Sequence, residues 1–218
     1  MDVFANGKTD HLILCELDQV EKRFRRNASP VLGPVSLSLH AGEVTGVRGD
    51  NGAGKSTLLS LIAGVYKPDK GRIRFAEGVS GAVGFVPQEL SLYESLSGYD
   101  NLTFYGIAAG LPARAIRVRS KWLLNELSLS DKGKDRVRDY SGGMKRRLHL
   151  ASALMVTPRL LLLDEPTVGA DSKSAEAIRG LIAHLKTLGC GVVLTSHREG
   201  DLETVCDRIV TLEEGRLV

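Results

Sequence analysis

Apolar and polar residues alternate along the chain in two different rhythms. Short apolar runs, typical of strands, alternate with longer segments in which apolar residues recur every three or four positions, as on one face of a helix. The expected strands are residues 12–20, 35–39, 43–47, 72–75, 82–86, 160–163, 192–195 and 208–212. The expected helices are residues 58–63, 100–109, a segment from Pro112 to about residue 127, 142–156 and 178–188. Strands that alternate with helices predict an α/β fold with a mostly parallel sheet and right-handed crossovers.

The middle of the chain has a different character. The pattern is helical from residue 98 to residue 129, and a charged turn follows at residues 131–139. This predicts a helical insert within the α/β core. We therefore expect one domain, in which residues 1–87 and 157–218 form the catalytic core and residues 88–156 form a helical subdomain.

Composition excludes several classes of protein. The chain has 218 residues, of which 43% are hydrophobic and 25% charged, as in a folded globular domain. Its net charge of +3 is too small to indicate a nucleic-acid partner. No stretch is long and apolar enough to span a bilayer, and the N-terminal residues do not resemble a signal peptide.

Basic residues gather in two short clusters, at residues 22–26 and 145–147. Such clusters are usually solvated surface, and we expect this for both, with a phosphate-binding role left open for the first. The three cysteines, Cys15, Cys190 and Cys206, are scattered and form no C-x-x-C pair. They indicate free thiols in a reducing cytosol.

A glycine-rich stretch lies between the expected strand 43–47 and the expected helix 58–63. It matches the spacing G-x-x-x-x-G-K-[ST] of a phosphate-binding P-loop, where unpaired backbone amides at a helix start attract anions. Glycines let the backbone approach the phosphates, the lysine reaches the β- and γ-phosphates, and the serine hydroxyl holds Mg²⁺. The P-loop residues are Gly49, Asp50, Asn51, Gly52, Ala53, Gly54, Lys55, Ser56 and Thr57.

Two carboxylates end the apolar run 160–163, as in many nucleotide sites. Asp164 is placed to reach the Mg²⁺ held by Ser56, and Glu165 to polarise a water against the γ-phosphate. His197 follows the apolar run 192–195. Ligands of α/β sheets bind at the C-terminal ends of strands, so we expect His197 to contact the γ-phosphate.

A further helix start, rich in glycine, follows the charged turn. Its residues are Ser141, Gly142, Gly143 and Met144. A Ser-Gly-Gly segment by itself is often a flexible turn, but at a helix start it can bind an anion. With this segment, the order of motifs over about residues 12–217 resembles one family closely, the nucleotide-binding subunits of ABC transporters. The family signature is usually Leu-Ser-Gly-Gly-Gln, and here Tyr140 replaces the leucine and Met144 the glutamine.

The resemblance implies roles for residues outside the P-loop and the signature. These residues are Phe24, Gln88, Asp164, Glu165, Asp171 and His197. Gln88 matches the Q-loop glutamine, which in the family touches Mg²⁺ and faces the membrane subunit. Asp171 matches the D-loop, and Phe24 lies where the family stacks an aromatic ring on adenine. The implied metal ligands are Ser56, Gln88 and Asp164, and the implied catalytic residues are Glu165 and His197.

The resemblance also implies a fold, a mechanism and partners. The fold is a P-loop NTPase core with a mostly parallel sheet, an antiparallel β subdomain on the N-terminal side and a helical insert. Two identical chains would close on ATP and Mg²⁺ as a homodimer, each P-loop facing the partner's signature. A separate integral membrane subunit would hold the chain at the cytoplasmic face of the membrane. The segment 164–171 resembles exporter-type (ABC-2-like) systems most.

Two other functions stay open at this point. One is a non-transport ABC ATPase, such as a regulatory or assembly factor, although the chain has neither tandem domains nor a long coiled-coil insert. The other is a P-loop kinase, which would need a substrate lid and would not explain residues 141–144.

Overall fold

The computed structural model describes residues 12–24, 29–197, 200 and 202–218. The chain forms two units. Unit 1 comprises the described residues up to Phe85 together with Pro158–Glu165 and Ala183–Val218. Unit 2 comprises Val86–Thr157 and Pro166–Ile182. The expected division at residues 88 and 156 stays a prediction.

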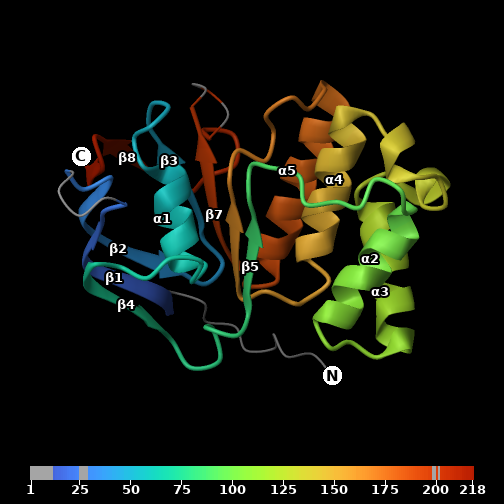
Figure 1. The fold of residues 1–218 in the computed structure, drawn as a ribbon, viewed down its shortest axis with the longest axis horizontal. Helices are drawn as coiled ribbons and strands as arrows, with labels where there is room; N and C mark the ends of the chain where they lie inside the picture. The colour runs from blue at the N-terminus through green and yellow to red at the C-terminus, as the bar shows by residue number, and fades with distance from the viewer. Residues whose placement is uncertain (1–11, 25–28, 198–199, 201) are drawn as a thin grey trace. The chain divides into compact units, whose positions relative to one another are not determined.

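Helices and strands follow one another along the chain as the pattern predicts (Figure 1). The strands are β1 (Ile13–Lys22), β2 (Leu32–His40), β3 (Val44–Arg48), β4 (Lys70–Phe75), β5 (Val83–Val86), β6 (Leu160–Leu163), β7 (Gly191–Ser196), β8 (Arg208–Glu213) and β9 (Arg216–Leu217). The helices are α1 (Lys55–Ile62), α2 (Gly98–Ala108), α3 (Ala113–Glu126), α4 (Gly142–Ala153) and α5 (Ser172–Thr187), with 3₁₀ turns η1 (Ser130–Lys132) and η2 (Val137–Asp139).

Unit 1 contains two sheets. The larger has the strand order β5-β6-β7-β3-β8-β9, in which β6, β7, β3 and β8 pair in parallel and β9 pairs antiparallel with β8. The smaller is antiparallel, with the order β2-β1-β4. The predicted fold class, a mostly parallel core with an antiparallel subdomain on the N-terminal side, is therefore confirmed. The sequence prediction missed β9, because a strand of two residues has no periodicity of its own.

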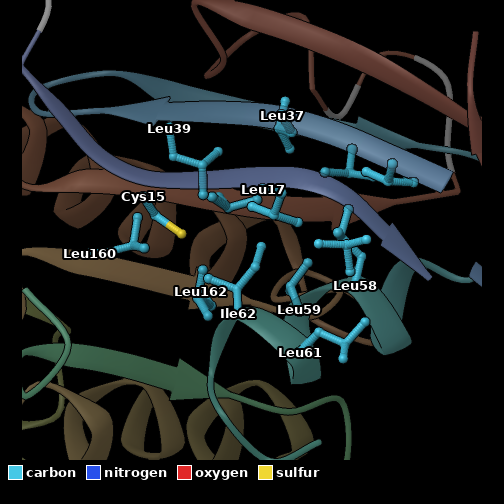
Figure 2. Packing of buried hydrophobic residues seen from close by; sticks show 14 of the residues in the cluster. Cys15, Leu17, Leu37, Leu39, Leu58, Leu59, Leu61, Ile62, Leu160 and Leu162 are labelled. Carbon is cyan, nitrogen blue, oxygen red and sulfur yellow. The ribbon is translucent and has the colours of Figure 1, made fainter. Parts of the chain in front are cut away.

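The core of unit 1 lies where α1 meets both sheets (Figure 2). Leucines 58, 59 and 61 and Ile62 of α1 are buried against apolar side chains of the antiparallel sheet and of β6. Leu160 and Leu162 of β6 are fully buried. Each Å² of apolar surface that is buried stabilises the folded chain by roughly 25 cal/mol. This burial holds α1 against the two sheets, and it therefore also holds the loop that precedes α1.

Unit 2 gathers α2, α3 and α4 around one another (Figure 1). Tyr140, which replaces the leucine of the family signature, is 6% exposed, and its hydroxyl donates to the carbonyl oxygen of Lys132 at 2.6 Å. Burial raises the pKa of Tyr140 to about 12. A Cβ at Gly98 would overlap with that hydroxyl. The tyrosine thus ties the turn after α3 to the start of the signature.

Several boundaries differ from the prediction for local reasons. β2 extends over Pro34, which an edge strand tolerates because its outer N–H groups need no partner. α4 ends at Ala153 rather than at residue 156, shortly before Pro158, which disfavours a helical residue in front of it. Within the described residues, no helix is long and apolar enough to cross a membrane.

Candidate functional site

The P-loop joins β3 to α1 in unit 1, and its backbone is fixed by a lysine. Gly54 caps α1 with φ 103°, and an added Cβ would lie 2.8 Å from the carbonyl oxygen of Val31, so only glycine fits. Lys55 is 6% exposed. Its Nζ donates to the carbonyl oxygens of Gly49 at 2.7 Å and of Asp50 at 3.0 Å. The ammonium group is therefore held inside the loop, beside the unpaired amides of the helix start.

The P-loop borders a cavity of about 1000 Å³ in unit 1. Residues 49–53 line it together with Arg48, His197 and the end of β8. Asn51, Gly52 and Ser56 are exposed, so the loop is open to a ligand. The volume is at the upper end of what small-molecule sites have, roughly 300–1,000 Å³. Its wall carries Arg48 and Arg216 together with Asp50, Glu213 and Glu214. The preference for an anionic ligand therefore rests on the P-loop at its edge, where helix-start amides attract anions.

Two acidic residues and a histidine meet at the C-terminal ends of β6 and β7. Asp164 and Glu165 are 3% and 6% exposed. His197 Nδ1 lies 2.7 Å from Glu165 Oε1. The hydroxyl of Thr195 donates to Asp164 Oδ1 at 2.7 Å and accepts the backbone N–H of Glu165 at 2.9 Å. The structure thus brings together three residues that the sequence predicted, and it adds Thr195, which the sequence prediction missed.

The residues present fit a magnesium nucleotide. Mg²⁺ prefers oxygen ligands and is usually held by one or two carboxylates together with substrate phosphates rather than by a full protein cage. Asp164 provides a carboxylate that is already fixed by Thr195, and Ser56 provides an exposed hydroxyl in the first turn of α1. Among the described residues, no group of three or more His, Cys, Asp or Glu side chains could form a cage. The donor set therefore fits a metal that arrives with phosphates.

Phe24, the predicted adenine contact, is 53% exposed in unit 1. Its ring packs edge-on against Tyr66 with centroids 5.1 Å apart, and the Lys22 ammonium lies 5.9 Å from its centroid. Tyr66, which the sequence analysis did not single out, therefore sets the orientation of this ring. Arg25 and Arg26 of the first basic cluster lie outside the described residues.

The signature residues lie in unit 2 at the start of α4. The Ser141 hydroxyl accepts the backbone N–H of Met144 at 3.2 Å, so it caps its own helix. Ser141 and Gly142 are exposed, whereas Gly143 is buried. A Cβ at Gly143 would overlap with the Ser174 hydroxyl and would lie 2.9 Å from Asp171 Oδ2. Gly143 therefore has a packing reason to be glycine, besides the phosphate contact that the sequence suggested.

Asp171 joins the predicted D-loop to α5 within the same unit. Its Oδ1 accepts the backbone N–H of Ser174 at 2.8 Å, and this hydrogen bond lowers the pKa of Asp171. The carboxylate is therefore a helix cap with a fixed orientation. Unit 2 thus brings together Gly143 and Asp171, which the sequence predicted as separate motifs.

Arg146 of α4 contacts two loops, one at Gln88 and one at Val168. Its Nη1 donates to the carbonyl oxygen of Gln88, and its Nε donates to the carbonyl oxygen of Val168 at 3.2 Å. The next residue, Arg147, is 6% exposed, and its Nη1 donates to the carbonyl oxygens of Leu127 and Ser128. The expectation that residues 145–147 are solvated surface is therefore wrong for Arg147, because backbone carbonyls of another segment meet it inside unit 2, whereas Arg146 is half-buried.

The substitution Arg146→Met is expected to loosen both loops. It removes two hydrogen bonds from a charged donor, and such bonds contribute roughly 1.5–3 kcal/mol each. Amide hydrogen exchange near Gln88 and Val168 should therefore accelerate by about tenfold or more. Lys145→Met is the matched control, because Lys145 lies on the same helix and pairs with Glu94 instead. Equal acceleration in both variants would show that the arginine does not hold these loops.

Comparisons with known proteins agree with this geometry. The profile of the ABC transporter family matches residues 32–168. Linearmycin resistance ATP-binding protein LnrL of Bacillus subtilis is 36% identical over 94% of this chain and 68% of its own length. Doxorubicin resistance ATP-binding protein DrrA of Mycobacterium tuberculosis is 36% identical over 91% of this chain and 62% of its own length. The chain thus spans about two thirds of the length of these relatives.

Solved structures show the same fold. An ATP-binding subunit of an ABC transporter matches with a TM-score of 0.83 and 29% identity, over 94% of this chain and 88% of that chain. CbiO1 of Clostridium perfringens, part of the transporter complex cbiONQ, matches with a TM-score of 0.83 and 27% identity, over 94% of this chain and 87% of that chain.

The fold and the P-loop site define an ATP-binding domain of the α/β P-loop class. The chain belongs to the ABC transporter family. This confirms the resemblance that its motifs carry, and with it the predicted class of ATP-binding subunit.

Proposed function

We propose that this chain hydrolyses ATP to drive an ABC transporter by dimerising on the nucleotide. The proposal depends mainly on the side chains at the C-terminal ends of β6 and β7. Glu165 is buried there and its Oε1 lies 2.7 Å from His197 Nδ1. The neighbouring carboxylate of Asp164 is fixed by a hydrogen bond from Thr195. β7 pairs directly with β3, which feeds the P-loop, so these groups belong to neighbouring strands of one sheet.

In this proposal the residues of unit 1 bind the triphosphate and activate a water. Lys55 and the amides of the P-loop bind the β- and γ-phosphates. Ser56 and Asp164 would be ligands for Mg²⁺, which when bound would offset the charge of the phosphates. The Mg²⁺ contact of Gln88 that the family resemblance implies stays a prediction. Glu165 takes a proton from the attacking water. The water oxygen forms a bond to the γ-phosphorus, and the bond between that phosphorus and the leaving ADP oxygen breaks. A His197 ring protonated on both nitrogens would donate from Nδ1 to Glu165 and from Nε2 toward the γ-phosphate.

A second copy of the chain would complete each site. Ser141 and Gly142 are exposed at the start of α4, where backbone amides and the helix dipole attract an anion. We propose that they contact the γ-phosphate bound to the P-loop of the partner, with Asp171 at the same interface. ATP would then stabilise the closed dimer, and hydrolysis would release it.

We further propose that unit 2 contacts an integral membrane subunit, which would place the chain at the cytoplasmic face of a membrane. Unit 2 exposes apolar side chains on the segment after Gln88 and on α2. They are Leu90, Tyr93, Phe104 and Ile107. Tyr93 and Phe104 pack ring against ring with centroids 4.6 Å apart, so these two side chains form one apolar surface. The names of LnrL and DrrA concern resistance to linearmycin and doxorubicin, which favours an exporter-type system here.

Mixing two inactive variants tests the shared site. Ser141→Arg alters the signature and Lys55→Met alters the P-loop, so each variant alone should hydrolyse ATP slowly. In a mixed dimer, the intact P-loop of one chain faces the intact signature of the other. The mixture should therefore hydrolyse ATP at least about tenfold faster than either variant alone, because one set of transition-state contacts is restored.

The control is Ser130→Arg, which changes an exposed serine of unit 2 outside the motifs. It should hydrolyse ATP like the unaltered chain. A mixture no faster than the sum of its two inactive components would show that the signature does not act on the nucleotide of a partner.

A further inference from the structure

We propose that Thr195 is a positioning residue for both carboxylates of the ATP site. Its hydroxyl orients Asp164 for the metal and fixes the backbone that carries Glu165. The inference rests on the proposed function, because it concerns how that site is held, and it assigns a role to a residue that no sequence motif marks.

The register of two parallel strands brings Thr195 to these carboxylates. Leu163 of β6 pairs with Leu194 of β7, so the next residues along each strand, Asp164 and Thr195, also lie beside one another. Thr195 is 1% exposed. Its hydroxyl is therefore shielded from water, and its hydrogen bonds inside the protein decide where it points.

The chemistry of a hydroxyl fits both contacts at once. A threonine hydroxyl has one hydrogen to donate and lone pairs to accept with. It donates to Asp164 Oδ1 at 2.7 Å and accepts the backbone N–H of Glu165 at 2.9 Å. The single donor is used on one oxygen of the carboxylate. The orientation of the whole carboxylate group is fixed as a result, as hydrogen-bonded partners fix the ligands of other metal sites.

The backbone of Glu165 needs such a partner. Its φ is 50°, in the left-handed region that residues with a Cβ rarely adopt. Conformations of this kind persist where surrounding contacts hold them. The hydrogen bond from the Glu165 amide to Thr195 is one of these contacts, and this turn lets Glu165 Oε1 reach His197 at 2.7 Å. Thr195 thus supports the metal carboxylate directly and the catalytic carboxylate through the main chain.

Thr195→Val is the central test, because valine keeps the shape of threonine and lacks only the hydroxyl. Affinity for a fluorescent ATP analogue is measured without metal and with Mg²⁺, and hydrolysis is measured against Mg²⁺ concentration. Without metal, the affinity should not change. The gain in affinity on adding Mg²⁺ should fall about tenfold, and the Mg²⁺ concentration for half-maximal hydrolysis should rise about 10- to 100-fold.

Two controls separate this role from general stability. Thr195→Ser keeps the hydroxyl and should restore both metal responses. Thr45→Val removes a hydroxyl of equal burial on the neighbouring strand β3, where it donates to Glu43 at 2.8 Å. It should leave the metal responses as they are. If Thr195→Val does not fold, Thr195→Ala and Thr195→Ser are compared in the same assays, and their difference gives the same answer.

The outcomes are distinct. An unaltered chain that shows no Mg²⁺-dependent hydrolysis would overturn the proposed function and this inference with it. An active unaltered chain whose Thr195→Val variant has the same metal responses would overturn only the role of Thr195. A loss shared equally by Thr195→Val and Thr45→Val would also overturn it, because the effect would then belong to the sheet in general.

Discussion

Glu165→Gln is expected to lower the turnover of ATP by at least about 100-fold, since a positioned general base contributes that much or more. Glutamine has nearly the same shape but cannot take a proton from the water. Glu165 is 6% exposed and its Oε1 lies 2.7 Å from His197 Nδ1, so the amide can occupy the same place without a change of packing. Because the P-loop is untouched, ATP should still bind, and the variant should stay in the closed dimer.

Phosphate release measures the turnover, equilibrium binding of ATP measures the affinity, and size-exclusion chromatography with light scattering measures the dimer. Glu126→Gln, an exposed glutamate at the end of α3, is the control and should behave as the unaltered chain in all three. A Glu165→Gln variant that turns ATP over at the unaltered rate would remove Glu165 from the role of base. A variant that is inactive but remains a monomer with ATP would contradict the proposed dimer instead.

Lys55→Met is expected to weaken ATP binding by about tenfold or more, since hydrogen bonds from a charged group contribute roughly 1.5–3 kcal/mol. At saturating ATP, hydrolysis should fall by about a further 100-fold, as when one preorganised donor is removed from a developing charge. Methionine keeps the length of the side chain but not the ammonium, which the carbonyl oxygens of Gly49 and Asp50 hold inside the loop. The affinity for ATP should fall more steeply with ionic strength in the unaltered chain than in the variant, because salt screens the attraction of the ammonium group for the phosphates.

Isothermal titration with ATP and Mg²⁺ measures this affinity. Lys121→Met removes an exposed lysine of α3 and is the matched control. An affinity for ATP that is the same in Lys55→Met and Lys121→Met would show that Lys55 does not bind the phosphates.

The sequence by itself determined the fold class and the parts of the site that are contiguous. The P-loop could be predicted because nine neighbouring residues, 49–57, contain the turn, the helix start and the lysine together. The order of largely apolar runs predicted β3, β6 and β7, because strands covered on both faces are mostly apolar. Carboxylates and a histidine that directly follow such strands lie at one edge of a parallel sheet, which explains why Asp164, Glu165 and His197 were found.

Only the tertiary structure decided which side chains hold that site in place. Thr195 and Asp164 are 31 residues apart, and Arg146 and Gln88 are 58 apart, so their contacts depend on strand register and packing rather than on a local pattern. For the same reason, Arg147 was predicted at the surface and is buried, since its partners are carbonyl groups of another segment. A hydroxyl or a guanidinium has no periodicity of its own. Its role is set by the chain that folding brings beside it.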